Sequence, residues 1–335
     1  MRFVNMYKQC RPYIDYIIFG LLLCLIPFMV DLGVVRFAYL TIIAGIIIYA
    51  IVALGLNLLM GYAGLVSLGT AAFMGVGAYF SAFFTMELGF GFFPSLVLTL
   101  IITSILGVLV GLVSLRVEGF FLAMATLAIA EIFQLVFIEF RSFTNSFIGR
   151  RATFPTIFGF TLDRNQTFFL LVAFLVIAMI VAHNFATSYT GRALSAMRGS
   201  EAAASAMGIN IYKYRLIAFA ISTAFAGLGG VLYMHFIRFT IPSTWVFTLS
   251  LMLVAAVVIG GPRSIAGTIV GAIVVFGVPD LILPNLPIIG GINGMPFVFT
   301  GVLIIIIVLY YPFGLVYIWQ DAKKLARKLR GGATS

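Results

Sequence analysis

Ionisable and amide side chains inside the long apolar stretches are few, and they are the first candidates for chemistry. Glu131 lies within an apolar run, and Gln134 follows three residues later on the same face of a helix. A carboxylate in hydrocarbon costs about 2.5–3.5 kcal/mol, so Glu131 must face a cavity or a partner, or be protonated. Two interpretations follow: a group in a polar pathway, or a structural hydrogen bond to a neighbouring helix. Asn57 presents the same two alternatives.

The motifs that usually mark catalysis and cofactor binding do not occur in the sequence. It contains no Gly-x-x-x-x-Gly-Lys-Ser/Thr loop for nucleotide phosphates, no Gly-x-Ser-x-Gly and no His-Glu-x-x-His. The histidines, His183 and His235, have no second ligand at helical spacing, and the cysteines, Cys10 and Cys24, fit no zinc or redox spacing. We therefore expect a chain that is not an enzyme and binds no cofactor or metal itself.

The composition indicates that these residues lie in a membrane. Of the 335 residues, 63% are hydrophobic and only 9% are charged, whereas a water-soluble domain carries roughly 25% charge. This excludes an ordinary soluble enzyme. The net charge of +10 is scattered between the apolar runs, which argues against a nucleic-acid-binding protein. The runs are continuous rather than alternating, so we expect helices, not a barrel, to cross the bilayer.

The apolar runs predict an all-α, polytopic membrane protein with about ten transmembrane or partly re-entrant helices, since each crossing needs roughly 20 residues. The expected crossings lie near residues 13–30, 37–60, 64–86, 93–115, 119–139, 166–186, 215–237, 244–261, 265–283 and 296–318. With ten crossings both termini lie on one side, which receives 14 of the 20 Lys and Arg residues. The positive-inside rule then predicts that both termini are cytoplasmic. Residues 1–320 form one transmembrane domain, and 321–335 form a basic cytoplasmic tail.

Two hydrophilic interruptions are long enough to have structure of their own. The first, residues 140–165, is predicted to lie outside although it is rich in arginine, which opposes the charge rule locally. It is either a docking surface for an external partner or an ordinary surface loop. Its arginines are Arg141, Arg150, Arg151 and Arg164.

The second interruption, residues 187–214, is predicted to lie in the cytoplasm as two short helices joined by a glycine. We expect these helices over residues 192–198 and 201–207. The residues expected to cap or end them are Ser188 or Thr190, Gly199, Ser200 and Gly208. Two short helices of this kind form a compact projection from the membrane domain.

The composition of this cytoplasmic loop leaves two roles open. Its alanines permit close approach of another backbone, and Leu194, Met197 and Met207 supply adaptable apolar contact. The loop is therefore suited to insertion into another protein. The alternative is a pair of interfacial helices that rest on lipid headgroups, attracted by their arginines.

Small residues are frequent in the predicted crossings, where they allow close packing of helices. The stretch from Gly61 to Gly77 also contains Ser67 and Thr70 among five glycines. Such a composition suits a broken helix that lines a polar cavity. This stretch is therefore a candidate pathway segment.

Four segments resemble LivM-type permeases, the membrane subunits of branched-chain amino-acid ABC importers. They are GLNLLMGYAGLVSLGTAAFMGVGAY at residues 55–79, FLAMATLAIAEIF at 121–133, GRALSAMRGSEAAASAMGINIYKYRLIAFAISTAFAGLGGVLY at 191–233, and SLMLVAAVVIGGPRSIAGTIVGA at 250–272. The resemblance spans most of residues 37–275. Several ordered matches of this length are far more specific than a single glycine motif.

This resemblance implies a channel formed with a homologous, LivH-like permease subunit. Two cytoplasmic ABC ATPase subunits that bind ATP and Mg would drive it, and an external substrate-binding protein would deliver the solute. The implied location is the bacterial cytoplasmic (inner) membrane, with many passes through the lipid bilayer. The implied function is ATP-driven import of branched-chain amino acids or a related small polar solute by alternating access.

The resemblance also assigns the cytoplasmic loop as the EAA-type loop that couples a permease to its ATPase. Gly208 lies one residue farther from the Glu-Ala-Ala triplet than the general spacing, so Ala203 and Ala204 fit its alanine positions better. The expected ATPase-coupling residues are Gly191, Arg192, Leu194, Met197, Arg198, Glu201, Ala203, Ala204, Met207 and Gly208. The candidate pathway residues are Asn57, Ser67, Thr70, Glu131 and Gln134.

Two other functional classes stay open at this point. An ion-coupled secondary transporter would need several buried carboxylates or polar broken helices, for which Glu131 alone is thin support. A non-transporting membrane scaffold would explain the basic loop and tail but not the glycine-rich broken helix. The solute is also open among branched-chain amino acids, urea and short amides, because residues 144–155 replace a Thr-Gly-Gly-rich stretch found in many relatives.

Overall fold

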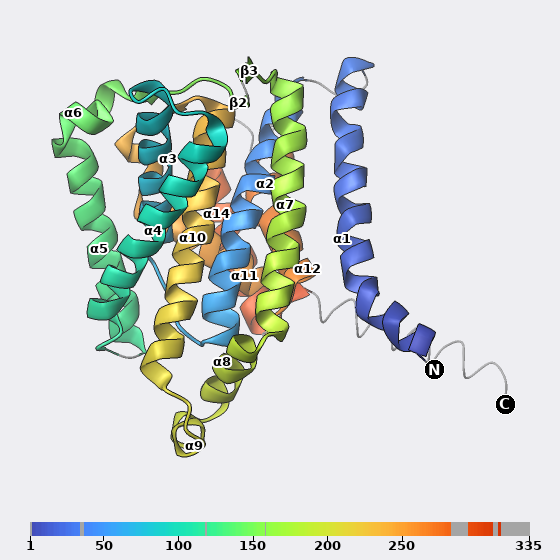
Figure 1. Cartoon of the computed structure of the whole chain (residues 1–335), viewed down its shortest axis with the longest axis vertical. Coiled ribbons are helices and arrows are strands. Elements are labelled where there is room, and N and C mark those ends of the chain that lie inside the picture. The colour runs from blue at the N-terminus through green and yellow to red at the C-terminus, as the bar shows by residue number, and fades with distance from the viewer. Residues whose placement is uncertain are drawn as a thin grey trace.

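The chain folds almost entirely into helices that run along one common axis, in the computed structural model drawn in Figure 1. The structure describes residues 2–33, 37–117, 119–157, 159–282, 294–310 and 314–315. Its elements, in chain order, are α1 (Arg2–Asp31), α2 (Phe37–Asn57), η1 (Leu58–Tyr62), α3 (Thr70–Met86), α4 (Phe92–Ser114), α5 (Phe120–Glu139), α6 (Arg141–Thr144), η2 (Ser146–Ile148), β1 (Arg150–Arg151), β2 (Thr156–Ile157), β3 (Phe160–Thr161), α7 (Arg164–Thr187), α8 (Tyr189–Gly199), α9 (Glu201–Ala206), α10 (Ile211–Ile237), β4 (Phe239–Thr240), η3 (Pro242–Trp245), α11 (Phe247–Gly260), α12 (Ile265–Ala272), η4 (Ile273–Gly277), α13 (Val278–Ile282) and α14 (Met295–Tyr310).

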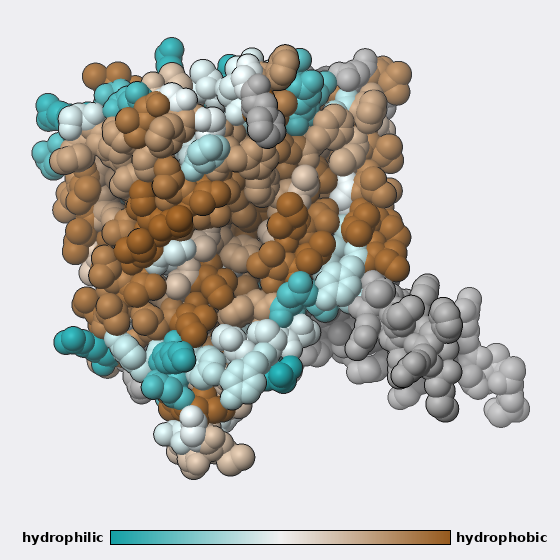
Figure 2. Space-filling view, in the orientation of Figure 1, coloured by the Kyte–Doolittle hydropathy of each residue, from teal (hydrophilic) through white to brown (hydrophobic). Residues whose placement is uncertain are grey.

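The helices are long and apolar enough to form a membrane domain. Among the described residues, seven helices could cross a bilayer by length and composition, and two shorter apolar helices, Thr70–Met86 and Ile265–Leu281, accompany them. Figure 2 shows a broad apolar belt, with hydrophilic side chains gathered along its upper and lower edges. The protein is therefore an all-α, polytopic membrane protein.

Four of the ten predicted crossings are not single uninterrupted α-helices in the described chain, and the one expected at 37–60 ends in the π-helical turn η1. The segment expected at 64–86 becomes helical only at Thr70, and Gly64 within it has a φ of +72°, outside the right-handed helical region. The segment at 244–261 divides into η3 and α11, and the one at 265–283 divides into α12, the π-helical turn η4 and α13. The tenth appears as α14, and most residues beyond Tyr310, including the predicted basic tail, lie outside the described residues.

Helix α10 occupies the middle of the bundle, where it packs against α2, α3 and α4. Its contact with α3 is made by glycines on both helices. A Cβ atom on Gly230 would collide with the carbonyl oxygen of Met74, and one on Gly77 would collide with the carbonyl oxygen of Gly227. The two backbones touch directly because a glycine without a side chain stands on at least one side of each contact. The predicted packing role of these glycines is confirmed.

Helix α1 lies at the edge of the bundle and packs against α7 (Figure 1). The hydroxyl of Tyr13 donates a hydrogen bond to Asn184 Oδ1 at 2.7 Å. The outward face of α1 is apolar, with Ile17, Leu21 and Leu25 all exposed. In a membrane protein such a face contacts lipid.

The two long hydrophilic interruptions fold at opposite ends of the bundle (Figure 1). Helices α8 and α9 project at one end, which also holds the start of α1. At the other end, α6, η2 and the strands β1–β4 lie over the ends of the long helices, and we call this layer the cover. Strand β1 pairs antiparallel with β4, with Arg150 opposite Thr240, and β2 pairs antiparallel with β3, with Thr156 opposite Thr161.

Candidate functional site

The break between α2 and α3 is the main irregular feature inside the bundle. The π-helical turn η1 ends α2, and residues 63–69 then run without helical structure to the start of α3. Hydroxyl groups from other helices satisfy the backbone there: Leu68 N–H donates to Thr126 Oγ1 at 3.0 Å, and Ala71 N–H donates to Ser250 Oγ at 2.9 Å. Such substitute partners make an irregular backbone tolerable at membrane depth. The predicted broken helix is confirmed.

Asn57 ties the start of this break to the turn between α11 and α12. The side chain is only 1% exposed. Its Nδ2 donates to Thr268 Oγ1 at 2.8 Å and to the carbonyl oxygen of Ser264 at 3.2 Å. Its Oδ1 accepts a hydrogen bond from the backbone N–H of Arg263 at 2.9 Å. This geometry supports the structural interpretation of Asn57, and its pathway role stays a prediction.

The carbonyl oxygen of Gly61 accepts hydrogen bonds from two arginines. One is Arg198 of α8, and the other is Arg263, whose Nε lies 3.1 Å from the oxygen. A Cβ atom on Gly61 would lie 2.8 Å from the backbone nitrogen of Arg263, so a side chain would force these groups apart. We call Asn57, Gly61, Arg198 and Arg263 the Gly61 cluster. Burial and the nearby Arg263 lower the pKa of the Arg198 guanidinium.

A small cavity, lined mainly by apolar atoms but with several hydroxyl residues at its wall, lies beside the break. Its volume is about 10 Å³, which is about the space that one water molecule needs. The side chains of the break meet those of α10 there. Its lining includes Ser67, Thr70, Phe73, Phe219, Ser222 and Thr223. The structure therefore brings two predicted pathway residues, Ser67 and Thr70, to one site and adds two hydroxyls that sequence reasoning missed.

Glu131 and Gln134 lie elsewhere, on α5. Glu131 is exposed on the outer surface of the described chain, and Gln134 is partly buried. The exposed face around Glu131 is otherwise apolar, with Met124, Ile132 and Leu135 among its members. Helix α4 offers a contrast, since its exposed large side chains are all apolar. Glu131 therefore makes the α5 face unlike a surface that simply contacts lipid.

The two short helices of the α8–α9 loop, the segment predicted at residues 187–214, begin at the predicted caps. Ser188 Oγ accepts a hydrogen bond from Gly191 N–H at 3.3 Å and starts α8, and Ser200 Oγ accepts from Ala203 N–H at 3.3 Å and starts α9. Helix α8 is longer than expected and includes Gly199. After α9, Gly208 has a φ of +80°, which the absence of a Cβ atom makes easy.

The coupling residues expected on α8 divide between the interior and the surface. Gly191, Leu194 and Met197 are buried against the chain itself, whereas Arg198 is exposed. Arg192 is exposed and donates to the carbonyl oxygen of Thr187 at 2.8 Å. The buried residues support the loop from beneath rather than offering a surface to another protein.

Helix α9 presents the exposed part of the loop. Ala203 is exposed, and Met207 is 84% exposed directly after the helix, whereas Ala204 is buried. Glu201 forms an ion pair with Arg215 of α10, which fixes the angle of α9. Small side chains beside an exposed methionine make a surface that another protein can approach closely.

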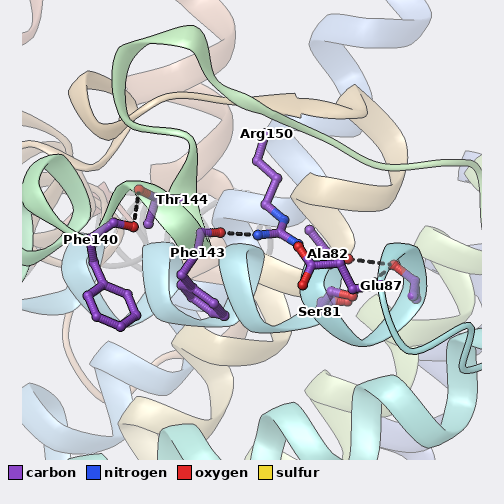
Figure 3. A network of polar contacts seen from close by, with 8 residues as sticks. Ser81, Ala82, Glu87, Phe140, Phe143, Thr144 and Arg150 are labelled. Carbon is purple, nitrogen blue, oxygen red and sulfur yellow. Dashed lines mark hydrogen bonds and ion pairs between the residues drawn. The ribbon is translucent and has the colours of Figure 1, made fainter.

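At the opposite end, a buried arginine holds the cover on the bundle (Figure 3). Arg150 is 4% exposed, forms an ion pair with Glu87, and donates to the carbonyl oxygen of Phe143. Its guanidinium carbon also lies 5.7 Å and 5.5 Å from the ring centroids of Phe83 and Phe143. Arg150 is therefore engaged inside the chain, whereas Arg141 and Arg151 are exposed. The docking role of the whole segment stays a prediction.

His235 joins the cover to the middle of the bundle. It is 2% exposed, with Nε2 2.9 Å from Ser81 Oγ and Nδ1 3.0 Å from the carbonyl oxygen of Thr153. A carbonyl can only accept, so Nδ1 carries the proton and Nε2 accepts from the Ser81 hydroxyl. Within the described ranges, no three His, Cys, Asp or Glu side chains gather as a metal site would require.

The residues that sequence reasoning missed share a recognisable signal. Ser222 and Thr223 are hydroxyl residues inside an otherwise apolar run, five and four residues before Gly227. Ser264 and Thr268 follow the turn sequence Gly-Gly-Pro-Arg, and a serine after such a turn often caps a helix. The pattern indicates these positions but does not identify their partners.

Comparison with known proteins agrees with this architecture. The family described as "Branched-chain amino acid transport system / permease component" matches residues 38–309. The high-affinity branched-chain amino acid transport system permease protein LivM of Salmonella typhimurium is 30% identical, over 89% of this chain and 73% of its own length. The probable branched-chain amino acid transport permease protein LivH of Methanocaldococcus jannaschii is 27% identical, over 85% of this chain and 95% of its own length.

A sugar transporter is also similar. The ribose import permease protein RbsC of Haemophilus influenzae is 25% identical, over 68% of this chain and 71% of its own length. No solved structure matches the chain significantly. Since the family match covers most of the membrane domain, the chain belongs to the family of branched-chain amino acid transport permease components and is a transport permease subunit.

Proposed function

We propose that this chain is the permease subunit of an ATP-driven importer for branched-chain amino acids or a related small polar solute. The α8–α9 loop is the observation that carries the proposal. It projects from one end of the bundle as two capped helices, with an alanine-rich surface and an exposed Met207. A separate ATPase can bind this surface without disturbing the apolar belt. Its two ATPase subunits would bind ATP and Mg, whereas this chain binds neither.

The complete assembly contains two permease subunits, two cytoplasmic ATPases and an external substrate-binding protein, in the bacterial cytoplasmic membrane. ATP-driven closure of the ATPases moves the α8–α9 loops, and rigid-body motion of helices opens the route alternately to each side. The similarity to permeases named for branched-chain amino acids supports that solute class, and the ribose permease similarity shows that related chains carry other polar solutes.

The outward position of Glu131 supports a route at the seam with the second permease subunit. A mid-span carboxylate on a lipid-facing surface carries a penalty of about 2.5–3.5 kcal/mol, which a polar partner or a hydrated route removes. We therefore assign the α5 face to the contact with the second permease. Ser67 and Thr70, beside the small cavity, lie on the side of the break that faces α10.

Reconstituted uptake tests the proposal. The complex is purified with its native partners, placed in proteoliposomes and supplied with ATP and labelled leucine, valine, ribose or urea, with and without the binding protein. ATP-dependent and binding-protein-dependent uptake of one of these solutes is expected. Uptake that follows a proton or sodium gradient without any ATPase subunit would replace this proposal with an ion-coupled transporter.

A further inference from the structure

One carbonyl oxygen joins three elements at the end of the bundle from which α8 and α9 project. The oxygen belongs to Gly61, and it accepts hydrogen bonds from Arg198 on α8 and from Arg263 in the turn between α11 and α12. The backbone of Arg263 makes two further hydrogen bonds. Its N–H donates to Asn57 Oδ1, and its carbonyl oxygen accepts from the Tyr62 hydroxyl at 3.2 Å. The end of η1 is thus tied both to the cytoplasmic loop and to the α11–α12 turn.

The break in the helix is what frees this oxygen. In a continuous α-helix, the N–H of Leu65 would bond to the carbonyl oxygen of Gly61. Here Leu65, which lies beyond the π-helical turn, donates its N–H instead to the carbonyl oxygen of Leu59 at 3.3 Å. The Gly61 oxygen therefore has to find partners outside its own helix, and the two guanidinium groups supply them.

Among the described residues, no carboxylate forms an ion pair with Arg198 or Arg263. A hydrogen bond from a charged donor is stronger and more directional than a neutral one. The two like charges nevertheless repel each other around a single neutral acceptor. Such a contact orients its members but can shift when α8 moves, because Arg198 and Arg263 are both exposed.

The Gly61 contact is also close to the candidate route. Ser67 follows Gly61 by six residues, and it lines the small cavity with Thr70. The far side of the break is held by Thr126 and Ser250, which belong to α5 and α11. A displacement at Gly61 therefore changes the angle of the break against a fixed far end.

We propose that Arg198 and Arg263 are positioning residues that transmit the movement of the α8–α9 loop to the break between α2 and α3. Arg198 is the moving member, because it belongs to the loop. Arg263 is the reference member, because its backbone is held by Asn57 and Tyr62. This role rests on the proposed function, since it requires an ATPase that moves the loop.

The test compares the amount of ATP hydrolysed with the amount of solute taken up. It uses the complete complex in proteoliposomes and the solute that the wild-type complex carries best from the panel above. The variants are Arg198→Ala, Arg198→Lys, Arg263→Ala and the double Arg198→Ala/Arg263→Ala. Lys213→Ala is the matched control, because Lys213 is an exposed cation at the same end and only its backbone N–H is engaged, by the Asn210 cap.

Loss of the Arg198 contact is expected to raise the ATP hydrolysed per solute about tenfold or more, with the melting temperature of the complex unchanged. Arg198→Lys keeps one charged donor and should restore most of the coupling. Arg263→Ala should also uncouple, and the double variant should be no worse than the more affected single variant, since both arginines share one acceptor. Lys213→Ala should match the wild type.

The outcomes separate this inference from the function on which it rests. If the wild-type complex shows no ATP-dependent uptake, the proposed function fails and this inference fails with it. If the wild type transports but Arg198→Ala and Arg263→Ala keep its ATP-to-solute ratio, only the transmission role is overturned. If Arg198→Ala does not assemble, Arg198→Lys and Arg263→Ala decide: an unchanged ratio in Arg263→Ala overturns the role, and uncoupling by it supports the role.

Discussion

Arg150 of β1 forms an ion pair with Glu87, the residue that directly follows α3. The pair joins positions 63 residues apart and closes the outer cover over the bundle (Figure 3). Its members differ sharply in exposure, since the Arg150 side chain is 5% exposed and that of Glu87 is 49% exposed. The arginine therefore depends on the contact far more than the glutamate does.

Removal of the arginine should destabilise the protein more than removal of the glutamate charge. Arg150→Ala leaves the Phe143 carbonyl unpaired and opens space beside the rings of Phe83 and Phe143, so we expect a loss of about 2–3 kcal/mol. Glu87→Gln should lose about 1 kcal/mol or less, because a half-exposed ion pair is screened by water. Unfolding in detergent measures both. A larger loss for Glu87→Gln would contradict this account.

The direct contact between α3 and α10 predicts a strong response to one added methyl group. Gly230→Ala places a Cβ atom against the carbonyl oxygen of Met74, so we expect destabilisation of about 1–3 kcal/mol. Gly301→Ala on α14 is the control, because nothing lies within 4 Å of its Cβ position. That change should be neutral or stabilise by about 0.5–1 kcal/mol. Equal melting temperatures for the two variants would count against close packing at Gly230.

If the α5 face contacts the second permease, as proposed, Glu131 should act in transport rather than in folding. Glu131→Gln should lower uptake about tenfold or alter the solute preference, because the proposed function places this charge at the second permease or the route. Glu131→Leu should have the same effect on uptake while leaving the purified chain equally or more stable. Ile105→Ala, on the lipid-facing side of α4, is the control. Unchanged uptake and preference in both Glu131 variants would return this residue to a structural role.

The end of α9 predicts a variant that inserts normally but does not transport. Gly208→Arg adds a charged side chain where φ is +80° and where the proposed function places the contact with the ATPase, so uptake should be abolished. Gly208→Asn is the conformational control, because asparagine tolerates this backbone region better than other residues and adds no charge. Membrane fractions, uptake and co-purified ATPase are measured together. Normal uptake by Gly208→Arg would remove the basis for the coupling assignment.

Local features of the fold could be predicted well from the sequence. Ser188, Ser200 and Gly208 cap or end the helices of the α8–α9 loop because each acts on its own neighbours. The run of glycines and hydroxyls after Gly61 predicted a broken helix for the same reason. Length and apolar composition likewise placed most of the long helices within a few residues of their observed ends.

Features that join distant segments could not be predicted. Arg198 and Arg263 lie 137 and 202 residues from Gly61, and no pattern in the sequence pairs them with its carbonyl oxygen. The start of α3 at Thr70 depends on hydroxyls of Thr126 and Ser250, which belong to other helices. Sequence periodicity reports which side of a helix is apolar, but it does not report what that side contacts.

The glycine contact between α3 and α10 limits how this protein can change shape. Two backbones in direct contact have no flexible side chains between them that could absorb sliding or tilting, so they move as one piece. A hinge must therefore lie where larger side chains or irregular segments separate the helices. Helices α3 and α10 would keep their positions relative to each other, and the surrounding helices would move around them.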